Sequence, residues 1–191
     1  DYNISLFDDD LIKIFLSKYY ESYVLNTYKA LVPFSYKSDF ARFCILYQRG
    51  GWYFDIGLRL NQRFEVSEST KLVFFRDINF YSQTSWACAG GIIYSKPGNK
   101  ILSKAIQLIV DSVKNNYYGL TPLCPTGPTL WGKAIASIGI DQNVIIGDFM
   151  ELTPIHNKKN KAMVLPDGSI FAFNKDAPGG DLKSLGCQGT N

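Results

Sequence analysis

The chain has 191 residues, with 20 Lys plus Arg against 17 Asp plus Glu and a formal net charge of +3. Hydrophobic residues make up 46% and charged residues 19%, which fits a globular domain and not a disordered chain or a coiled coil. No apolar run approaches the roughly 18 residues of a membrane span, and the scattered basic residues argue against a nucleic-acid ligand. We expect one domain over residues 1–191, which could be cut from a longer chain at both ends.

The cysteines argue for reduced thiols and not for a metal or redox site. Cys44, Cys88, Cys124 and Cys187 have no CxxC spacing and no nearby histidine, so neither a zinc site nor a dithiol motif is indicated. Cys44 and Cys88 stand in apolar runs, where a thiol packs as a small hydrophobe. This pattern, with no secretion signal, favours a cytoplasmic location.

Three helices are predicted in the first quarter of the chain. Asp8-Asp9-Asp10 before an apolar run is a capped helix start. A second helix covers residues 21–31 and ends before Pro33. A third covers residues 38–49, with Ser38 or Asp39 as its cap and Gly50-Gly51 ending it. The third helix is apolar on most sides, which predicts that it is buried.

Strands and helices then alternate. Residues 52–54 suit a central strand that delivers Asp55 to its C-terminal end. Further strands are predicted at residues 71–75 and 86–94, the latter interrupted by Gly90-Gly91, a sign of a bulge or of close approach by a ligand. Pro97 opens an amphipathic helix, residues 119–128 form a Pro/Gly-rich loop, and residues 129–138 form a short helix. Asp167-Gly168 indicates a late hairpin. The order predicts an α/β fold whose mixed, mostly parallel sheet is flanked by helices.

One polar constellation stands out. In open α/β sheets ligands bind outside the C-terminal ends of the strands, where Asp55 is expected. Asp39 and Arg42, at i and i+3 of an otherwise apolar helix, leave the same face. The residues alone leave two interpretations open: a ligand site, or a helix-capping ion pair beside a turn-capping Asp55.

The pattern as a whole resembles a known family. The stretch Lys37-Ser38-Asp39-Phe40-Ala41-Arg42, followed by Leu46-Tyr47, Gly50-Gly51, Tyr53 and Asp55, is similar to the core of glycosyltransferase family 32, the glycosyltransferase sugar-binding region that contains a DXD motif. The match departs from the family at Asp55-Ile56-Gly57, where glycine stands in place of the second Asp.

The resemblance implies a GT-A fold and a divalent-cation-dependent hexosyltransferase that acts with retention of configuration. The implied partners are a nucleotide-sugar donor and a saccharide acceptor, as in polysaccharide biosynthesis, either free in the cytoplasm or peripherally at the inner face of the membrane. It assigns catalysis and donor binding to Asp39, Arg42 and Asp55. By this analogy Asp39 accepts hydrogen bonds from sugar hydroxyls, Arg42 offsets charge on the donor diphosphate, and Asp55 binds Mn²⁺ or Mg²⁺. A non-catalytic relative that binds a nucleotide or a glycan through a degenerate motif is the alternative.

Further candidates complete the expected site. Donor binding is extended to three residues around Asp55: Tyr53, Gly90 and Gly91. The acceptor side is assigned to Trp86, Asp77, Thr126 and Gly127. His156, the only histidine, is a candidate second metal ligand, against the more common role of a solvated loop residue.

Overall fold

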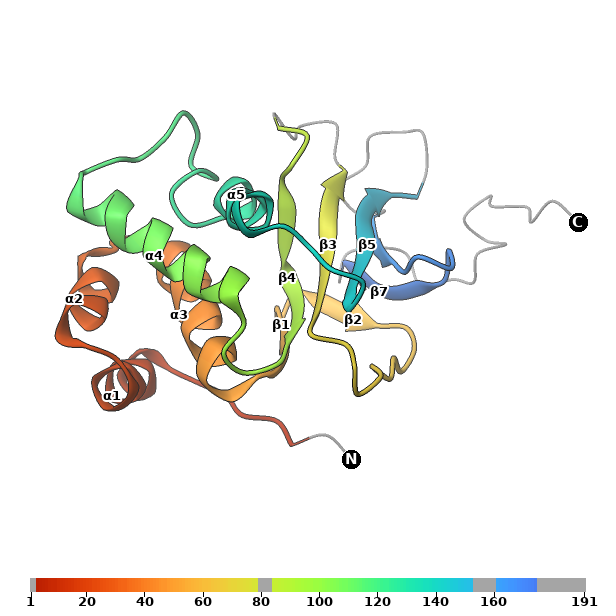
Figure 1. The fold of residues 1–191 in the computed structure, drawn as a ribbon, viewed down its shortest axis with the longest axis horizontal. Coiled ribbons are helices and arrows are strands. Elements are labelled where there is room, and N and C mark those ends of the chain that lie inside the picture. The colour runs from red at the N-terminus through yellow and green to blue at the C-terminus, as the bar shows by residue number, and fades with distance from the viewer. Residues whose placement is uncertain (1–2, 79–83, 153–160, 175–191) are drawn as a thin grey trace, which may run out of the picture.

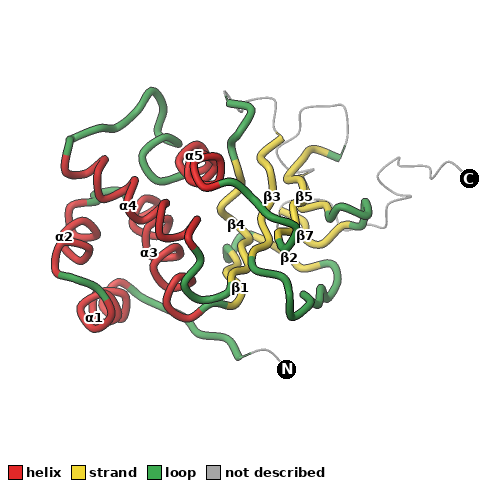
Figure 2. Tube along the Cα trace, in the orientation of Figure 1, coloured by secondary structure: helices red, strands yellow, loops and turns green. Residues whose placement is uncertain are grey.

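The structure is a computed structural model, and it describes residues 3–78, 84–152 and 161–174. The helices are α1 (Asp9–Tyr19), α2 (Ser22–Ala30), α3 (Phe34–Arg49), α4 (Lys100–Lys114) and α5 (Pro128–Ile138). The strands are β1 (Gly51–Phe54), β2 (Leu58–Leu60), β3 (Leu72–Ile78), β4 (Cys88–Ser95), β5 (Val144–Glu151), β6 (Lys161–Val164) and β7 (Ile170–Asn174). The helices gather on one side of the sheet (Figures 1 and 2). No helix of the described residues is long and apolar enough to cross a membrane.

The sheet is mixed but mostly antiparallel, which corrects the expectation of a mostly parallel sheet. Its strand order is β1-β4-β3-β5-β6-β7-β2. Among the described strands only β3 and β5 pair in parallel. β4 lies between β1 and β3 and runs against both, so β1, β3 and β5 still point the same way. Their C-terminal ends therefore lie on the same side of the sheet.

β1 is an edge strand and not the central strand that its aromatic run predicted. The curl of the sheet covers part of Trp52, whereas Phe54 at the end of the strand is 38% exposed. β1 and β2 lie at opposite ends of the strand order, yet only residues 55–57 join them, so the two edges lie within about 14 Å of each other. Trp52 and Phe54 of β1 contact Phe171 of β7 with ring centroids 5.4 and 6.2 Å apart. Asp55 consequently lies where the two edges of the curled sheet meet.

The main core lies between the helices and the sheet. Leu16, Phe40, Leu102 and Trp131 are almost fully buried there together with Phe74 of β3. Burial of each such side chain is worth roughly 1.5–3 kcal/mol. A second cluster around Val73, Phe75, Met163 and Phe171 fills the inside of the curl. Side chains of β3 alternate between the two cores, as the period of a strand requires.

α3 begins earlier than its sequence pattern predicted. Pro33 is the N-cap, with φ −67° and ψ 133°, and no side chain caps the helix. The fixed φ of proline and the helical residues 34–37 place Ser38 and Asp39 inside the helix. Neither residue is a cap, so the capping interpretation of Asp39 is wrong. The predicted C-terminus is confirmed, because Gly50 has a φ of 66° and its N–H bonds to Leu46 O.

Other elements match the sequence pattern with shifted ends. Asp8 caps α1 by accepting a 2.8 Å hydrogen bond from the Leu11 N–H. α4 is capped by Asn99 and buries its apolar stripe. β3 extends three residues beyond the predicted end, so Arg76 and Asp77 are within the strand. The late hairpin of β6 and β7 is confirmed, whereas β2 was not predicted.

Candidate functional site

Asp39 and Arg42 form an ion pair on the side of α3 that faces the sheet. Arg42 Nη2 lies 2.7 Å from Asp39 Oδ1, the distance of a charge-assisted hydrogen bond. The Arg42 side chain is only 6% exposed and that of Asp39 is 19% exposed. A charged pair with so little solvent around it is not an ordinary surface i,i+3 pair.

Asp55 reaches the same place from the end of β1. Its backbone N–H donates to Gly91 O at 2.8 Å, which extends the β1–β4 pairing by one residue. Its carboxylate accepts a 2.6 Å hydrogen bond from Tyr53 Oη at Oδ1, and the same oxygen lies 3.8 Å from Arg42 Nη2. With 43% of its side chain exposed, Asp55 is the most accessible of the three charged residues.

Tyr53 contacts both the Arg42 guanidinium and the Asp55 carboxylate. Its ring lies under the Arg42 guanidinium, with 4.5 Å from Cζ to the ring centroid, a cation–π distance. Burial, together with the adjacent Asp55 carboxylate, raises the pKa of the Tyr53 hydroxyl to about 12, against the lowering effect of Arg42. The phenol therefore stays protonated at neutral pH and remains a hydrogen-bond donor to Asp55.

The predicted β4 bulge is present at the two glycines. Val73 pairs with Tyr94 while Phe75 pairs with Ala89, so β4 holds extra residues between these two pairs. Gly90 O accepts a hydrogen bond from Arg42 Nη1. A Cβ at Gly91 would lie 3.1 Å from Asp55 Oδ2. Both glycines thus contact the charged side chains through a backbone that has no room for a side chain at Gly90 and little room for one at Gly91.

Thr126 joins this group from the loop before α5. Its hydroxyl donates a 2.9 Å hydrogen bond to Asp39 Oδ2, and the residue is 1% exposed. Thr126 therefore lies beside Asp39 and behind the surface, although it was predicted on the acceptor side. We call Asp39, Arg42, Tyr53, Asp55 and Thr126 the α3–β1 cluster.

The electrostatics of Asp39 follow from its position. Burial raises the pKa of its carboxyl above the ordinary value, while Arg42 and the Thr126 hydrogen bond lower it and Asp55 raises it further. The two carboxylates and one guanidinium of the α3–β1 cluster sum to one negative charge when all are ionised. Such a cluster suits ligand groups that donate hydrogen bonds, such as hydroxyls, or a cation.

The other predicted residues are not all brought to the α3–β1 cluster. Asp77 lies two residues after Phe75 in β3, so its side chain faces the inside of the curl. Burial raises the pKa of its carboxyl above the ordinary value, and Lys161 acts against this rise. Trp86 is 51% exposed beside the start of β4. Gly127 is the N-cap of α5. His156 lies outside the described residues.

The described residues form no metal site by themselves. No group of three or more His, Cys, Asp or Glu side chains among residues 3–78, 84–152 and 161–174 could hold a metal ion. Both Asp39 oxygens have protein partners, which leaves Asp55 as the accessible carboxylate. The site therefore fits a divalent cation if Asp55 supplies one ligand and a bound molecule supplies the others. This arrangement is common for Mg²⁺ bound with phosphates.

The site includes contributions that the sequence pattern did not indicate. Ser38 Oγ lies 3.4 Å from Tyr53 Oη, and Ser38 O faces Arg42 Nε at 3.5 Å. Leu58 of β2 comes against Gly91. The position of Ser38 next to Asp39 is the one signal in the sequence that could have indicated its contact with Tyr53. The contact of Leu58 with Gly91 had no such signal, because β2 has only three residues.

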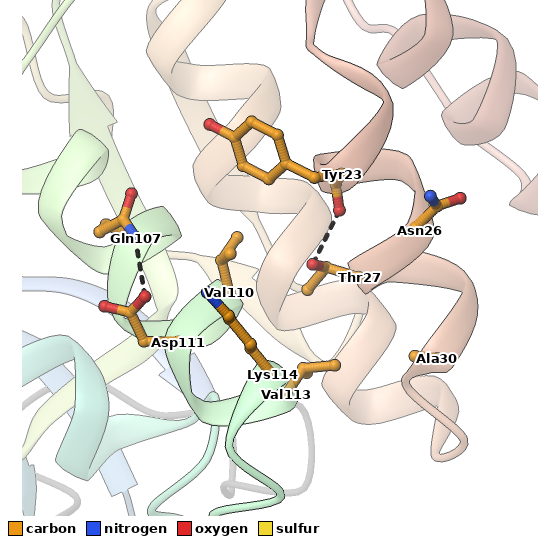
Figure 3. Close-up of a pocket in the computed structure, with 9 residues that line it drawn as sticks. All are labelled: Tyr23, Asn26, Thr27, Ala30, Gln107, Val110, Asp111, Val113 and Lys114. Carbon is orange, nitrogen blue, oxygen red and sulfur yellow. Dashed lines mark hydrogen bonds between the residues drawn. The ribbon is translucent and has the colours of Figure 1, made fainter.

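A separate groove lies between α2 and α4, about 530 Å³ in volume. Figure 3 shows Tyr23 and Thr27 of α2 facing Gln107 and Asp111 of α4. Two hydrogen bonds already engage its polar groups, from Thr27 to Tyr23 O and from Gln107 to Asp111. None of the predicted site residues lines this groove.

Comparison with known proteins confirms the family resemblance over the first part of the chain. Residues 1–84 match the sequence model of the glycosyltransferase sugar-binding region containing DXD motif. This stretch carries Asp39, Arg42, Tyr53 and Asp55. None of the curated proteins matches the chain.

Among solved structures, the chain is similar to the PaToxG glycosyltransferase, with 19% sequence identity and a TM-score of 0.49. The superposition covers 68% of this chain and 52% of that one. The chain thus spans about half the length of that solved protein.

Proposed function

We propose that this chain carries the donor-sugar site of a retaining glycosyltransferase of GT-A type. It would transfer a hexose from a nucleotide sugar to a saccharide acceptor. The observation that carries the proposal is the convergence of Asp39, Arg42 and Asp55: two come from α3 and one from the end of β1, yet Arg42 Nη2 lies within 4 Å of both carboxylates. The family match covers all three positions.

The chemistry of the α3–β1 cluster suits a sugar. Asp39 and Asp55 are acceptors held in place by protein donors, and each carboxylate oxygen can accept a second hydrogen bond. Sugar hydroxyls supply such donors in pairs. Because the carboxylates are already oriented by Arg42, Tyr53 and Thr126, little side-chain freedom is lost on binding.

In the proposed transfer the bond between the anomeric carbon and the diphosphate oxygen breaks, and its electron pair leaves with the diphosphate. The acceptor oxygen forms the new bond on the same side, and its proton passes to the departing phosphate oxygen. This course needs no enzyme nucleophile. Carboxylates near the sugar ring would stabilise the positive charge that develops on it.

A divalent cation, Mn²⁺ or Mg²⁺, would bind at Asp55 and neutralise charge on the departing diphosphate. Gly57 stands where the family has a second Asp, so the free protein should bind the cation weakly. Donor and cation should then bind cooperatively, because each completes the site of the other. His156 stays a candidate for a further ligand.

The acceptor side and the location in the cell are further parts of the proposal. Trp86, an exposed aromatic side chain at the start of β4, suits stacking against an acceptor sugar better than Asp77, which faces the inside of the curl. Gly127 stays a candidate for the acceptor side because it lies at the end of the loop before α5. We place the enzyme in the cytoplasm, free or at the inner face of the membrane, in polysaccharide biosynthesis.

The test is hydrolysis of a panel of nucleotide sugars, with and without Mn²⁺, by the wild type and Asp39→Asn. We expect the wild type to release the nucleoside diphosphate from one donor, and Asp39→Asn to be at least about 100-fold slower. Asp141→Asn, an exposed carboxylate paired with Lys71, is the matched control. Tight binding of a donor without any turnover would instead favour the non-catalytic relative.

A further inference from the structure

The guanidinium of Arg42 has protein partners at every nitrogen. Nη2 contacts Asp39 at 2.7 Å, Nη1 donates to Gly90 O, and Nε faces Ser38 O at 3.5 Å. One face of the group lies on the Tyr53 ring. With the side chain only 6% exposed, the donors of Arg42 are directed into the protein.

The β4 bulge is matched to this guanidinium. The extra residues of β4 bring Gly90 O onto Nη1, and a Cβ at residue 90 would lie 2.6 Å from that nitrogen. Only glycine permits so close an approach. A buried guanidinium is costly unless its donors are satisfied, so the bulge and the ion pair together explain how Arg42 can be buried.

The carboxylates, by contrast, are on the accessible side. The exposed fraction of the side chain rises from 6% for Arg42 to 19% for Asp39 and 43% for Asp55. A ligand that approaches the α3–β1 cluster therefore meets the carboxylates first, with the guanidinium behind them. The family resemblance implied that Arg42 contacts the donor diphosphate; these contacts and this burial argue for another role.

We infer that Arg42 is a positioning residue, which holds Asp39 and Asp55 in place from inside the protein and does not bind the diphosphate of the donor. Gly90 is its partner in this role. The inference rests on the proposed function for the identity of the ligand, but the arrangement itself can be tested in the free protein. It follows that the charge on the diphosphate is offset by a group other than Arg42.

Kinetics separates positioning from phosphate binding. Arg42→Gln should lower kcat about 100-fold through misplaced carboxylates, while the Kd for the free nucleoside diphosphate changes less than about threefold. Gly90→Ala, which keeps the arginine but crowds Nη1, should lower kcat in the same way. Arg49→Gln, at the end of the same helix, is the control. A loss of nucleoside diphosphate affinity of tenfold or more in Arg42→Gln, with normal affinity in Gly90→Ala, would overturn the inference.

The deciding experiment needs no turnover and therefore stays informative if the proposed function fails. It records the ¹⁵N side-chain signals of arginine in the ligand-free wild type, with Arg42→Lys used for assignment. We expect resolved, slowly exchanging Nη signals from Arg42 that inorganic pyrophosphate and nucleoside diphosphates do not shift, and that Gly90→Ala removes. Averaged Nη signals in the free protein, or signals that shift when pyrophosphate saturates, would contradict the role of Arg42.

Discussion

Thr126 donates a hydrogen bond to the Asp39 carboxylate across 87 positions of sequence, at a distance of 2.9 Å. The bond ties the loop before α5 to the second turn of α3. It also satisfies the oxygen of Asp39 that Arg42 does not contact. The loop and the helix therefore share one buried polar contact, so a change in the position of the loop alters the environment of the Asp39 carboxylate.

Replacement of Thr126 tests this link. Thr126→Val keeps the shape but removes the donor, so Asp39 loses one of the two groups that lower its pKa. We expect a loss of about 0.5–1.5 kcal/mol in the free energy of unfolding and a higher pKa for Asp39. Thr126→Ser should restore both. Equal behaviour of the Val and Ser variants in urea denaturation would show that the hydrogen bond has no such effect.

The raised pKa of Asp39 predicts a pH dependence of stability. Burial raises this pKa above its ordinary value of 3.8, so the folded state holds the proton more tightly than the unfolded state does. Ionisation of Asp39 then destabilises the fold as the pH rises through the folded-state pKa. The stability of the wild type relative to Asp39→Asn should therefore increase as the pH falls toward 3.8. Urea denaturation of both proteins from neutral pH down to 3.8 measures the difference in their free energies of unfolding. A difference that stays constant over these pH values would be the contrary result.

Gly57 can be replaced without strain. Its φ is outside the left-handed region, and a Cβ there would have no neighbour within 4 Å. Gly57→Asp should thus fold normally and supply a second carboxylate near Asp55. We expect Mn²⁺ to bind about tenfold more tightly by calorimetric titration. Gly57→Asn is the neutral control; the same gain in both variants, or none in Gly57→Asp, would show that residue 57 does not face the cation.

The packing of α5 against the chain before β4 requires a glycine at position 132. A Cβ at this position would overlap the backbone of Trp86, which joins β3 to β4. Gly132→Ala should force α5 away from the sheet and cost about 1–3 kcal/mol or more. Gly57→Ala, where the added methyl group has open space, should change stability by less than about 1 kcal/mol. Chemical denaturation of the two variants provides the comparison.

Sequence patterns predicted the elements better than their arrangement. The amphipathic period of α4 and the glycines after α3 locate helices because both signals are local. The sheet was expected to be mostly parallel because helices and strands alternate, but the pairing of β4 between β1 and β3 is a long-range choice that local sequence does not encode. The position of Asp39 inside α3 does not follow from the sequence pattern, because Pro33 is equally consistent with the end of the preceding helix and with the start of α3.

The candidate site shows the same division. Asp39, Arg42 and Asp55 could be selected from their spacing, and the structure brings them together. Their neighbours depend on tertiary contacts: Thr126 arrives from a distant loop, and Gly90 meets Arg42 only because β4 is bulged. The burial of Arg42 follows from these contacts, so its proposed role could not be derived from the sequence.

In the proposed function the α3–β1 cluster binds the sugar of a nucleotide-sugar donor. The most direct measurement compares the Kd of the intact donor with that of its nucleoside diphosphate, for the wild type and for Asp39→Asn, in the presence of Mn²⁺. We expect the wild type to bind the intact donor more tightly than the nucleoside diphosphate, and Asp39→Asn to lose this difference while its affinity for the nucleoside diphosphate is kept. An unchanged difference between the two ligands in Asp39→Asn would show that the α3–β1 cluster does not bind the sugar.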